Sequence, residues 1–285
     1  MKKIIVVGAN GQLGSCLQEL ANNEKQIEFV FLTNTDLDIT DQTAVQTLCG
    51  QVKPDVIINA AAYTAVDKAE TDEQVAYDVN AKAVGYLAEA CSATGARLIH
   101  VSTDYVFDGN ATTPYREDDM PNPQGVYGAT KLEGEKLALQ GNANAVVVRT
   151  SWVYSKYGHN FVKTMMRLMK ERDTLNVVDD QVGCPTHAID LAKALLIMAT
   201  TESFVPGIYH FSNSGPISWY TFAEAIREIG GFTTKVSPIS SDQYPTPAKR
   251  PAWSVMSNDK IAALYGIVQQ DWRKSLESCM AQLMD

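Results

Sequence analysis

The chain has 285 residues, of which 45% are hydrophobic and 20% are charged, an ordinary composition for a water-soluble globular protein. Its formal net charge of -9 argues against general binding to nucleic acid or to anionic membranes, because both need a basic surface. The five cysteines are scattered and form no C-x-x-C pair, so a disulfide framework is not expected and a reducing compartment fits.

No stretch approaches the roughly 18 apolar residues of a membrane span. The apolar run Ile4–Val7 that follows two lysines ends at Gly8 and is too short for the core of a signal peptide. We therefore expect a cytoplasmic protein with no membrane and no nucleic-acid partner.

Strand-like and helix-like segments alternate through the first half of the chain. Short apolar runs predict strands at residues 2–7, 27–32, 54–62, 96–103 and 144–154, and helical patterns lie between them at residues 12–22, 41–52, 72–95 and 128–141. This alternation is typical of a parallel sheet with helices on both faces. The fold class is therefore α/β, a Rossmann-type doubly wound parallel sheet with a smaller C-terminal α/β substrate-binding domain.

The pattern loosens after residue 155. A helix near residues 159–173 places Phe161, Met165, Leu168 and Met169 on one stripe, which indicates core packing. The segments near 174–200 and 207–213 are predicted to return to the sheet. We assign residues 1–153, with those return segments, to a dinucleotide-binding Rossmann domain, and residues 154–285 mainly to a substrate-binding domain.

The sequence GANGQLG follows the first predicted strand and opens the first helix. Glycines at Gly8, Gly11 and Gly14 permit a tight turn and let backbone N–H groups approach a pyrophosphate at the positive end of a helix. We expect this loop, with Gln12 and Leu13, to bind a dinucleotide cofactor.

The end of the second predicted strand selects between the two nicotinamide cofactors. An acidic residue there binds the ribose 2′-hydroxyl and repels a 2′-phosphate, but this chain has Thr33. We therefore expect NADPH, with NADH possible. Asp38 and Ile39 are expected beside the adenine, and further cofactor contacts are expected from residues at the ends of the next two strands: Ala62, Tyr63, Thr64 and Val101.

Tyr127 and Lys131 are four residues apart on one predicted helix, so they share a helix face. A nearby ammonium group favours the phenolate form of tyrosine and is expected to lower the phenol pKa. The Y-x-x-x-K spacing alone is common by chance. Thr103, which ends the fourth predicted strand, adds a hydroxyl that could bind a substrate carbonyl oxygen.

The glycine loop, Thr103 and the Tyr127–Lys131 pair, in that order, resemble the extended short-chain dehydrogenase/reductase family. Within it, the motifs STDYVFDG, VYGATKLEGE, RTSWVY, NFVKTMMRL, DQVGCPT, GIYHFSN and YPTPAKRP are similar to those of the dTDP-4-dehydrorhamnose reductases. The resemblance implies reduction of the 4-keto group of dTDP-4-dehydro-L-rhamnose, with Tyr127 as proton donor and Lys131 binding the cofactor. It also implies that Thr103 and Asp104 flank the sugar, that Trp152 packs against the substrate and that Arg250 contacts the diphosphate.

Three alternatives to a reductase are considered. Related dehydratases follow the threonine with an Asp–Glu pair, whereas Thr103 is followed here by Asp104 and Tyr105, which disfavours elimination. A non-catalytic cofactor-binding regulatory subunit is disfavoured by the intact Thr103, Tyr127 and Lys131. A nucleotide-sugar epimerase remains open.

Some rhamnose reductases form dimers bridged by magnesium through glutamates. By alignment of motifs, Cys16 and Ile189 occupy two of those glutamate positions, and neither supplies the oxygen ligand that magnesium requires. Glu19 and Asp190 are displaced from the matching helical positions. We expect no metal, and a monomer.

Overall fold

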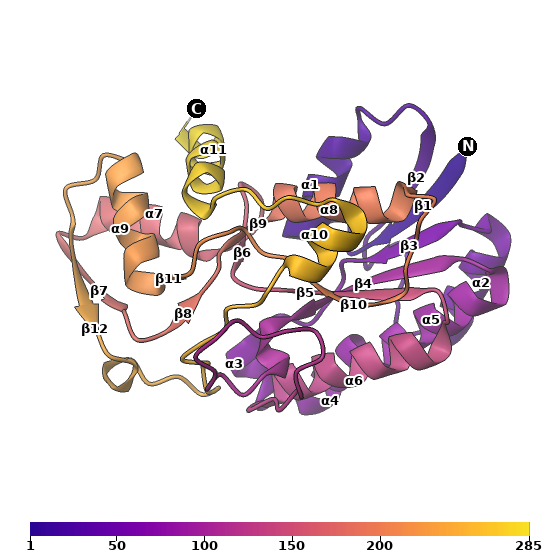
Figure 1. Ribbon diagram of the computed structural model, residues 1–285, viewed down its shortest axis with the longest axis horizontal. Helices are drawn as coiled ribbons and strands as arrows, with labels where there is room; N and C mark the ends of the chain where they lie inside the picture. Colours follow the sequence, from indigo (N-terminus) through magenta and orange to yellow (C-terminus); the bar gives the residue numbers. More distant parts are fainter. Residues whose placement is uncertain (285) are drawn as a thin grey trace.

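The computed structural model describes residues 1–284 and is built around a six-stranded sheet (Figure 1). The strands are all parallel, and they follow the order β10-β5-β4-β3-β1-β2. Their bounds are β1 (Lys2–Val7), β2 (Ile27–Leu32), β3 (Val56–Asn59), β4 (Arg97–Thr103), β5 (Ala145–Thr150) and β10 (Gly207–His210). The chain reverses its direction of growth between β1 and β3, the position at which such sheets bind nucleotides beyond the carboxyl ends of their strands.

Helices cover both faces of the sheet, so its strands are buried on both sides. Helices α1 (Gln12–Ala21) and α8 (Ala188–Thr200) lie on one face, and α2 (Gln42–Val52), α5 (Ala83–Thr94) and α6 (Val126–Gly141) lie on the other (Figure 1). Alternate residues of β1 enter the two cores: Ile4 and Val6 face α1, whereas Ile5 and Val7 face α5. The predicted Rossmann-type α/β fold is confirmed.

The predicted helix over residues 72–95 is confirmed, but it contains a π-helical turn that the sequence pattern did not predict. The segment consists of α4 (Glu73–Tyr77), a π-helical turn (Asp78–Lys82) and α5. Within the wide turn lies the buried Asn80, whose side chain bonds the N–H and the C=O of Tyr63 on the loop after β3. Single π-turns occur frequently at functional sites, and this one places an amide against the carboxyl edge of the sheet. A short helix, α3 (Val66–Ala69), lies in the same loop.

The C-terminal part of the chain has a separate core. Helices α7 (Phe161–Glu171), α9 (Trp219–Ile229) and α11 (Trp272–Met284) pack there with the two-stranded sheet formed by β7 (Thr174–Val178) and β12 (Lys235–Ile239) (Figure 1). Met165 and Met169 are buried in this core, and Phe161 and Leu168 pack against it, which confirms core packing for the predicted stripe.

The predicted return to the central sheet near residue 174 is wrong in its first part. Strand β7 pairs in parallel with β12, whereas α8 and β10 are the elements that join the large sheet. The reason is the alternation along β7: Leu175 and Val177 are buried, and Thr174 and Asn176 are exposed. A central parallel strand needs apolar residues on both faces, and β7 has only one.

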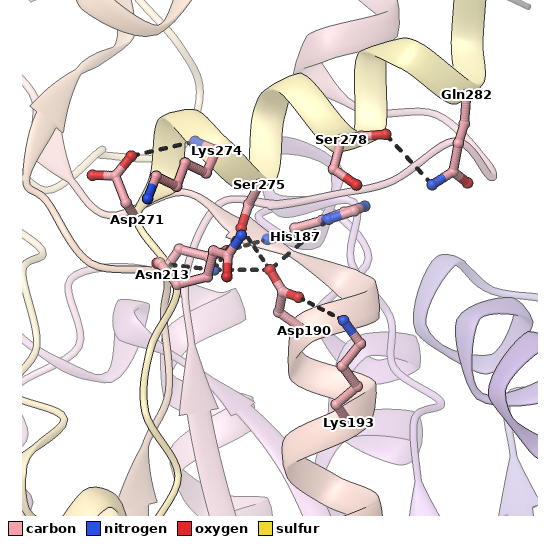
Figure 2. A network of polar contacts seen from close by, with 10 residues as sticks. His187, Asp190, Lys193, Asn213, Asp271, Lys274, Ser275, Ser278 and Gln282 are labelled. Carbon is pink, nitrogen blue, oxygen red and sulfur yellow. Dashed lines mark hydrogen bonds and ion pairs between the residues drawn. The ribbon is translucent and has the colours of Figure 1, made fainter.

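Short elements connect the two parts. They are β6 (Val153–Tyr154) paired with β9 (Thr186–His187), β8 (Val182–Gly183) paired with β11 (Ile217–Ser218), the 3₁₀ turns Asp104–Val106 and Ser241–Gln243, and α10 (Asp259–Tyr265). Figure 2 shows how α11 is fastened to α8. Asp190 accepts hydrogen bonds from Asn213 (3.0 Å) and from the Ser275 hydroxyl (2.6 Å). Among residues 1–284, no helix has the length and apolar character needed to cross a membrane.

Candidate active site

The glycine loop is crowded by backbone, which explains its residue types. Gly8 has a φ of 81°, and a Cβ built on it would lie 2.6 Å from the backbone nitrogen of Ala61. A Cβ on Gly14 would overlap the backbone of Gly8 and Ala9. Helix α1 starts with Gly11 as an N-cap and has no side-chain cap, so first-turn N–H groups are left for an external acceptor. The loop therefore has the form of a pyrophosphate cradle.

Two further predicted cofactor residues, Gln12 and Leu13, lie in the first turn of α1. The side-chain oxygen Oε1 of Gln12 accepts from Ser155 (3.0 Å) and from Asn160 (2.9 Å), in the segment after β6. Leu13 is buried in the core beneath α1. Both side chains are thus engaged within the protein, and their backbone N–H groups are the parts that remain available at this helix end.

A carboxylate lies at the end of β2, contrary to the prediction from Thr33. The chain turns back after Thr33, and Asp36 accepts hydrogen bonds from the Thr33 N–H (2.9 Å) and hydroxyl (2.6 Å). These bonds lower the pKa of Asp36. Asp38 is exposed and accepts from Thr40, while Ile39 is buried in the core near α2. Sequence reading missed Asp36 because the turn brings it three residues back.

The loop after β3 carries Ala62, Tyr63 and Thr64, and Asn80 holds it in place. Asn80 Oδ1 accepts from the Tyr63 N–H at 2.9 Å, and Asn80 Nδ2 donates to the Tyr63 carbonyl at 3.1 Å. The same amide lies 3.3 Å from the hydroxyl of Thr130 on α6. Sequence analysis did not single out Asn80; the available signal was an amide on the otherwise apolar face of a helix.

Thr103 and Asp104 lie together where β4 ends. The Thr103 hydroxyl donates to Asp104 Oδ1 at 3.0 Å, and both side chains are buried. Asp104 Oδ2 has no hydrogen-bond partner among residues 1–284. Burial raises the pKa of Asp104 to about 6, against the opposing effect of the nearby Ser254 and Thr103 hydroxyls. A carboxyl group in this state can exchange a proton near neutral pH.

Tyr127 and Lys131 come to the same edge from α6. Burial raises the pKa of Tyr127 to about 12; the Thr103 hydroxyl opposes this rise and Asp104 adds to it. Lys131 does not contribute, so the expected lowering of the phenol pKa by Lys131 is wrong for this structure. The reason is that Lys131 Nζ turns into the protein, where it donates to the Val101 carbonyl at 2.7 Å.

Beneath Lys131 is a buried ion pair that sequence analysis missed. Arg149 on β5 donates to both carboxylate oxygens of Glu135, at 2.7–3.2 Å, and both residues are about 1% exposed. Ser102 on β4 also donates to Glu135. Each residue was unremarkable in its own element; their pairing depends on the contact between α6 and the sheet.

Trp152, the predicted substrate-packing residue, has an unusual backbone. Its φ of 48° is one of two positive values among the non-glycine residues 1–284, a conformation that costs energy for a bulky side chain. The indole stacks on Trp219 with ring centroids 3.5 Å apart. Gly183 lies between this indole and the Ser254 hydroxyl, so Trp152 is near the Thr103–Asp104 corner. Trp219 was not predicted.

Arg250, the predicted diphosphate partner, is held by the loop after β3. Its guanidinium donates to Asp67 at 2.7 Å, and Asp67 also accepts from the backbone of Ala248. Arg250 lines a recess with Tyr105 and Lys249, and Tyr105 packs edge-on against Tyr127 with ring centroids 5.5 Å apart. One aromatic ring thus separates Arg250 from the phenol.

The positions compared with magnesium ligands are engaged inside the protein. Cys16 is buried and Ile189 packs against the core below the sheet. Glu19 accepts from the Tyr157 hydroxyl and pairs with Lys156. Asp190 accepts hydrogen bonds from Asn213 and Ser275 and forms an ion pair with Lys193 (Figure 2). Residues 1–284 hold no group of three or more His, Cys, Asp or Glu side chains suited to a metal ion.

A Rossmann-type sheet with a glycine loop at its first strand and a Thr–Tyr–Lys set at its carboxyl edge defines the extended short-chain dehydrogenase/reductase class. The family model described as RmlD substrate binding domain matches residues 1–284. A dTDP-4-dehydrorhamnose reductase of Aggregatibacter actinomycetemcomitans is 43% identical over 99% of each chain. The chain belongs to the dTDP-4-dehydrorhamnose reductase family.

Two solved structures of that family superimpose on this one. A dTDP-4-dehydrorhamnose reductase of Clostridium acetobutylicum has a TM-score of 0.96 at 42% identity, covering 99% of this chain and 100% of the other. One of Bacillus anthracis, solved in complex with NADP, has a TM-score of 0.95 at 39% identity with the same coverage.

Proposed function

We propose that this protein reduces the 4-keto group of dTDP-4-dehydro-L-rhamnose, giving dTDP-L-rhamnose, with Tyr127 as the proton donor. The observation that carries the proposal is the meeting of Thr103, Asp104, Tyr127 and Lys131 at the carboxyl edge of β4. The names of relatives that match over the whole chain support the substrate. Five free, buried cysteines suit a reducing cytoplasm, where we place the reaction.

The glycine loop fits a dinucleotide, because the lack of a Cβ at Gly8 and Gly14 lets the turn pack directly against backbone and because α1 begins without a side-chain cap. NADPH bound there would supply the hydride that reduces the sugar carbonyl. The residues at the edge of the sheet hold the substrate oxygen and move the proton. The Asn80-held loop, with Ala62 to Thr64, would border the cofactor, and Lys131 would bond its ribose.

Tyr127 is suited to donate. With a pKa of about 12 the phenol keeps its proton at neutral pH, and it gives it up as negative charge develops on the carbonyl oxygen. The Thr103 hydroxyl binds the same oxygen. Asp104 has a pKa of about 6 and can change charge near neutral pH. It influences the pKa of the Tyr127 phenol through its contact with Thr103. Trp152 packs against the sugar, and Arg250 can bond two oxygens of the diphosphate once released from Asp67.

The direct test is incubation with dTDP-4-dehydro-L-rhamnose and NADPH while the reduced-nicotinamide absorbance is followed. A reductase consumes one NADPH for each dTDP-L-rhamnose formed. An epimerase interconverts nucleotide sugars without net consumption, and a regulatory subunit does neither. Product without NADPH loss, or no product, would contradict the proposal.

We predict that NADPH is used at least as well as NADH, and that Asp36 limits the preference. A 2′-phosphate near Thr33 would meet the Asp36 carboxylate, so Asp36→Asn should raise the NADPH/NADH ratio of kcat/KM by about tenfold, equal to about 1.4 kcal/mol. Paired steady-state measurements with both cofactors decide this. Asp38→Asn, whose carboxylate is engaged with Thr40, is the matched control. A wild type that strongly prefers NADH would refute the first part, and an unchanged ratio the second.

We predict a metal-independent monomer. Glu19 and Asp190 already bond Tyr157, Lys156, Asn213 and Ser275, so recruiting them to magnesium would break those contacts. Gel filtration should give one monomer peak, and activity in excess EDTA should equal that in magnesium. A dimer that dissociates on chelation, or activity that vanishes, would show this to be wrong.

A further inference from the structure

His100 is a buried histidine in the middle of β4 to which the proposed reaction assigns no role. Its parallel neighbour on β3 is Asn59, so the two side chains lie on the same face of the sheet. Asn59 Nδ2 is 3.1 Å from His100 Nδ1, and Lys131 Nζ is 3.3 Å from His100 Nε2. Asn59 and His100 are fully buried and Lys131 is 1% exposed. A polar chain therefore runs through the protein interior to Lys131.

The direction of the hydrogen bonds that link Asn59, His100 and Lys131 is fixed at the Asn59 end. The Ala61 N–H donates to Asn59 Oδ1 at 3.1 Å, which leaves the NH₂ of Asn59 facing the imidazole. An amide NH₂ only donates, so His100 Nδ1 is the acceptor. A neutral imidazole carries one N–H, and here it must be on Nε2, the nitrogen that faces Lys131.

An Nε2–H donor suits one of the two forms of Lys131. An ammonium group has three N–H donors and no lone pair. An ammonium on Lys131 would therefore face His100 Nε2–H with no acceptor between the two donors. An amine accepts from Nε2–H while it donates to the Val101 carbonyl at 2.7 Å. Burial acts in the same direction. It lowers the pKa of Lys131 to about 8 and that of His100 well below its usual value, so the ring is neutral.

The other ionisable groups near Lys131 oppose this only in part. Glu135, one turn along α6, favours the ammonium form. However, Arg149 on β5 bonds both carboxylate oxygens of Glu135. Asp104, in the turn after β4, acts on Tyr127. Beside burial, which is the largest effect on the pKa of Lys131, the contact with His100 Nε2 is the local hydrogen bond that favours the amine.

We propose that His100, oriented by Asn59, is a positioning residue that donates to the amine of Lys131 and so favours the neutral form of this lysine. The role rests on the proposed reduction. When Tyr127 gives its proton to the substrate oxygen, a phenolate remains. Uptake of one solvent proton by Lys131 Nζ balances that charge, and when a solvent proton restores the phenol, Lys131 returns its own proton to solvent.

The first test is the tautomer of His100 in the wild-type protein, without cofactor or substrate. Long-range ¹H–¹⁵N spectra of ¹⁵N-histidine protein distinguish Nδ1–H from Nε2–H. Of the four histidine signals, that of His100 is the one lost in His100→Gln. The expected result is a neutral Nε2–H ring from pH 6 to 9. An Nδ1–H or a charged ring would overturn the proposal.

The second test is the titration of Lys131, followed by its ¹³Cε shift and assigned by its loss in Lys131→Met. Asn59→Asp replaces a donor with an acceptor, so it should move the imidazole proton to Nδ1 and turn Nε2 toward the ammonium. The pKa of Lys131 should then rise by about 1 unit or more, which is the scale of one hydrogen bond. No rise would overturn the proposal.

The control separates the hydrogen-bonded chain from the added charge. Asn59→Asp combined with His100→Phe keeps the carboxylate but removes the imidazole, so less than half of the rise should remain. A rise that persists in full would mean that the carboxylate acts through space, which contradicts a role for His100. Both tests are made without substrate. An inactive wild-type protein would therefore refute the proposed reductase function, while the two tests would still give a result for His100.

Discussion

Replacing Tyr127 with phenylalanine should lower kcat for reduction by about 10²-fold or more, the usual scale of general acid catalysis, while cofactor affinity stays nearly unchanged. The substitution removes the phenolic hydroxyl and keeps the ring that packs edge-on against Tyr105. Steady-state kinetics give kcat, and fluorescence titration with NADPH gives the dissociation constant. The expected result is a loss in turnover without a loss in binding.

Tyr86→Phe is the matched control. It makes the same chemical change on α5, in a side chain that packs against the core of the sheet domain, and its kcat should stay within about twofold of the wild type, because no reacting proton is involved. A Tyr127→Phe enzyme with activity within a few-fold of the wild type would remove Tyr127 from the role of donor. A large loss in both variants would point to damage to the fold.

The second large effect concerns stability. Arg149→Met should lower the free energy of unfolding by about 3–5 kcal/mol, because it leaves the Glu135 carboxylate buried without its partner. The side chains of the pair are 1% and 2% exposed, and the pair joins β5 to α6, the helix that carries Tyr127, Lys131 and Glu135 itself. Urea unfolding followed by circular dichroism measures the change.

Two controls accompany this measurement. Arg167→Met removes an arginine from an exposed pair with Glu171 and should cost no more than about 1 kcal/mol. Arg149→Met combined with Glu135→Leu removes both charges and should recover part of the loss. If the buried and exposed arginine variants lost equal stability, the ion pair would not be what holds α6 to the sheet.

Local pattern was enough for the large sheet. Apolar runs such as Ile4–Val7, spaced by helical segments, require a parallel sheet because strands buried on both faces need helices on both sides. The glycine loop could also be predicted from local pattern, because it directly follows a buried strand. Thr103 and Tyr127 could be assigned to one edge because all the carboxyl ends of a parallel sheet lie together.

Contacts between distant segments could not be predicted from the sequence. The pairing of β7 with β12, the π-turn around Asn80 and the Arg149–Glu135 pair each depend on how separate elements pack. Each was missed or predicted wrongly. Asp36 is a local exception, because a turn after β2 reverses the chain and brings a carboxylate to Thr33, although the strand pattern ended before it.

The sequence by itself determined the order of the strands and helices in the first half of the chain and the residue types at the edge of the sheet, because both follow from short-range patterns of apolar side chains and glycines. The tertiary structure alone decided the charge states. Lys131 and Tyr127 are neighbours on one helix, yet burial moves their pKa values to about 8 and about 12. Lys131 turns toward His100 and Val101. Desolvation and hydrogen-bond direction depend on every group packed around a side chain, and no spacing along the chain encodes them.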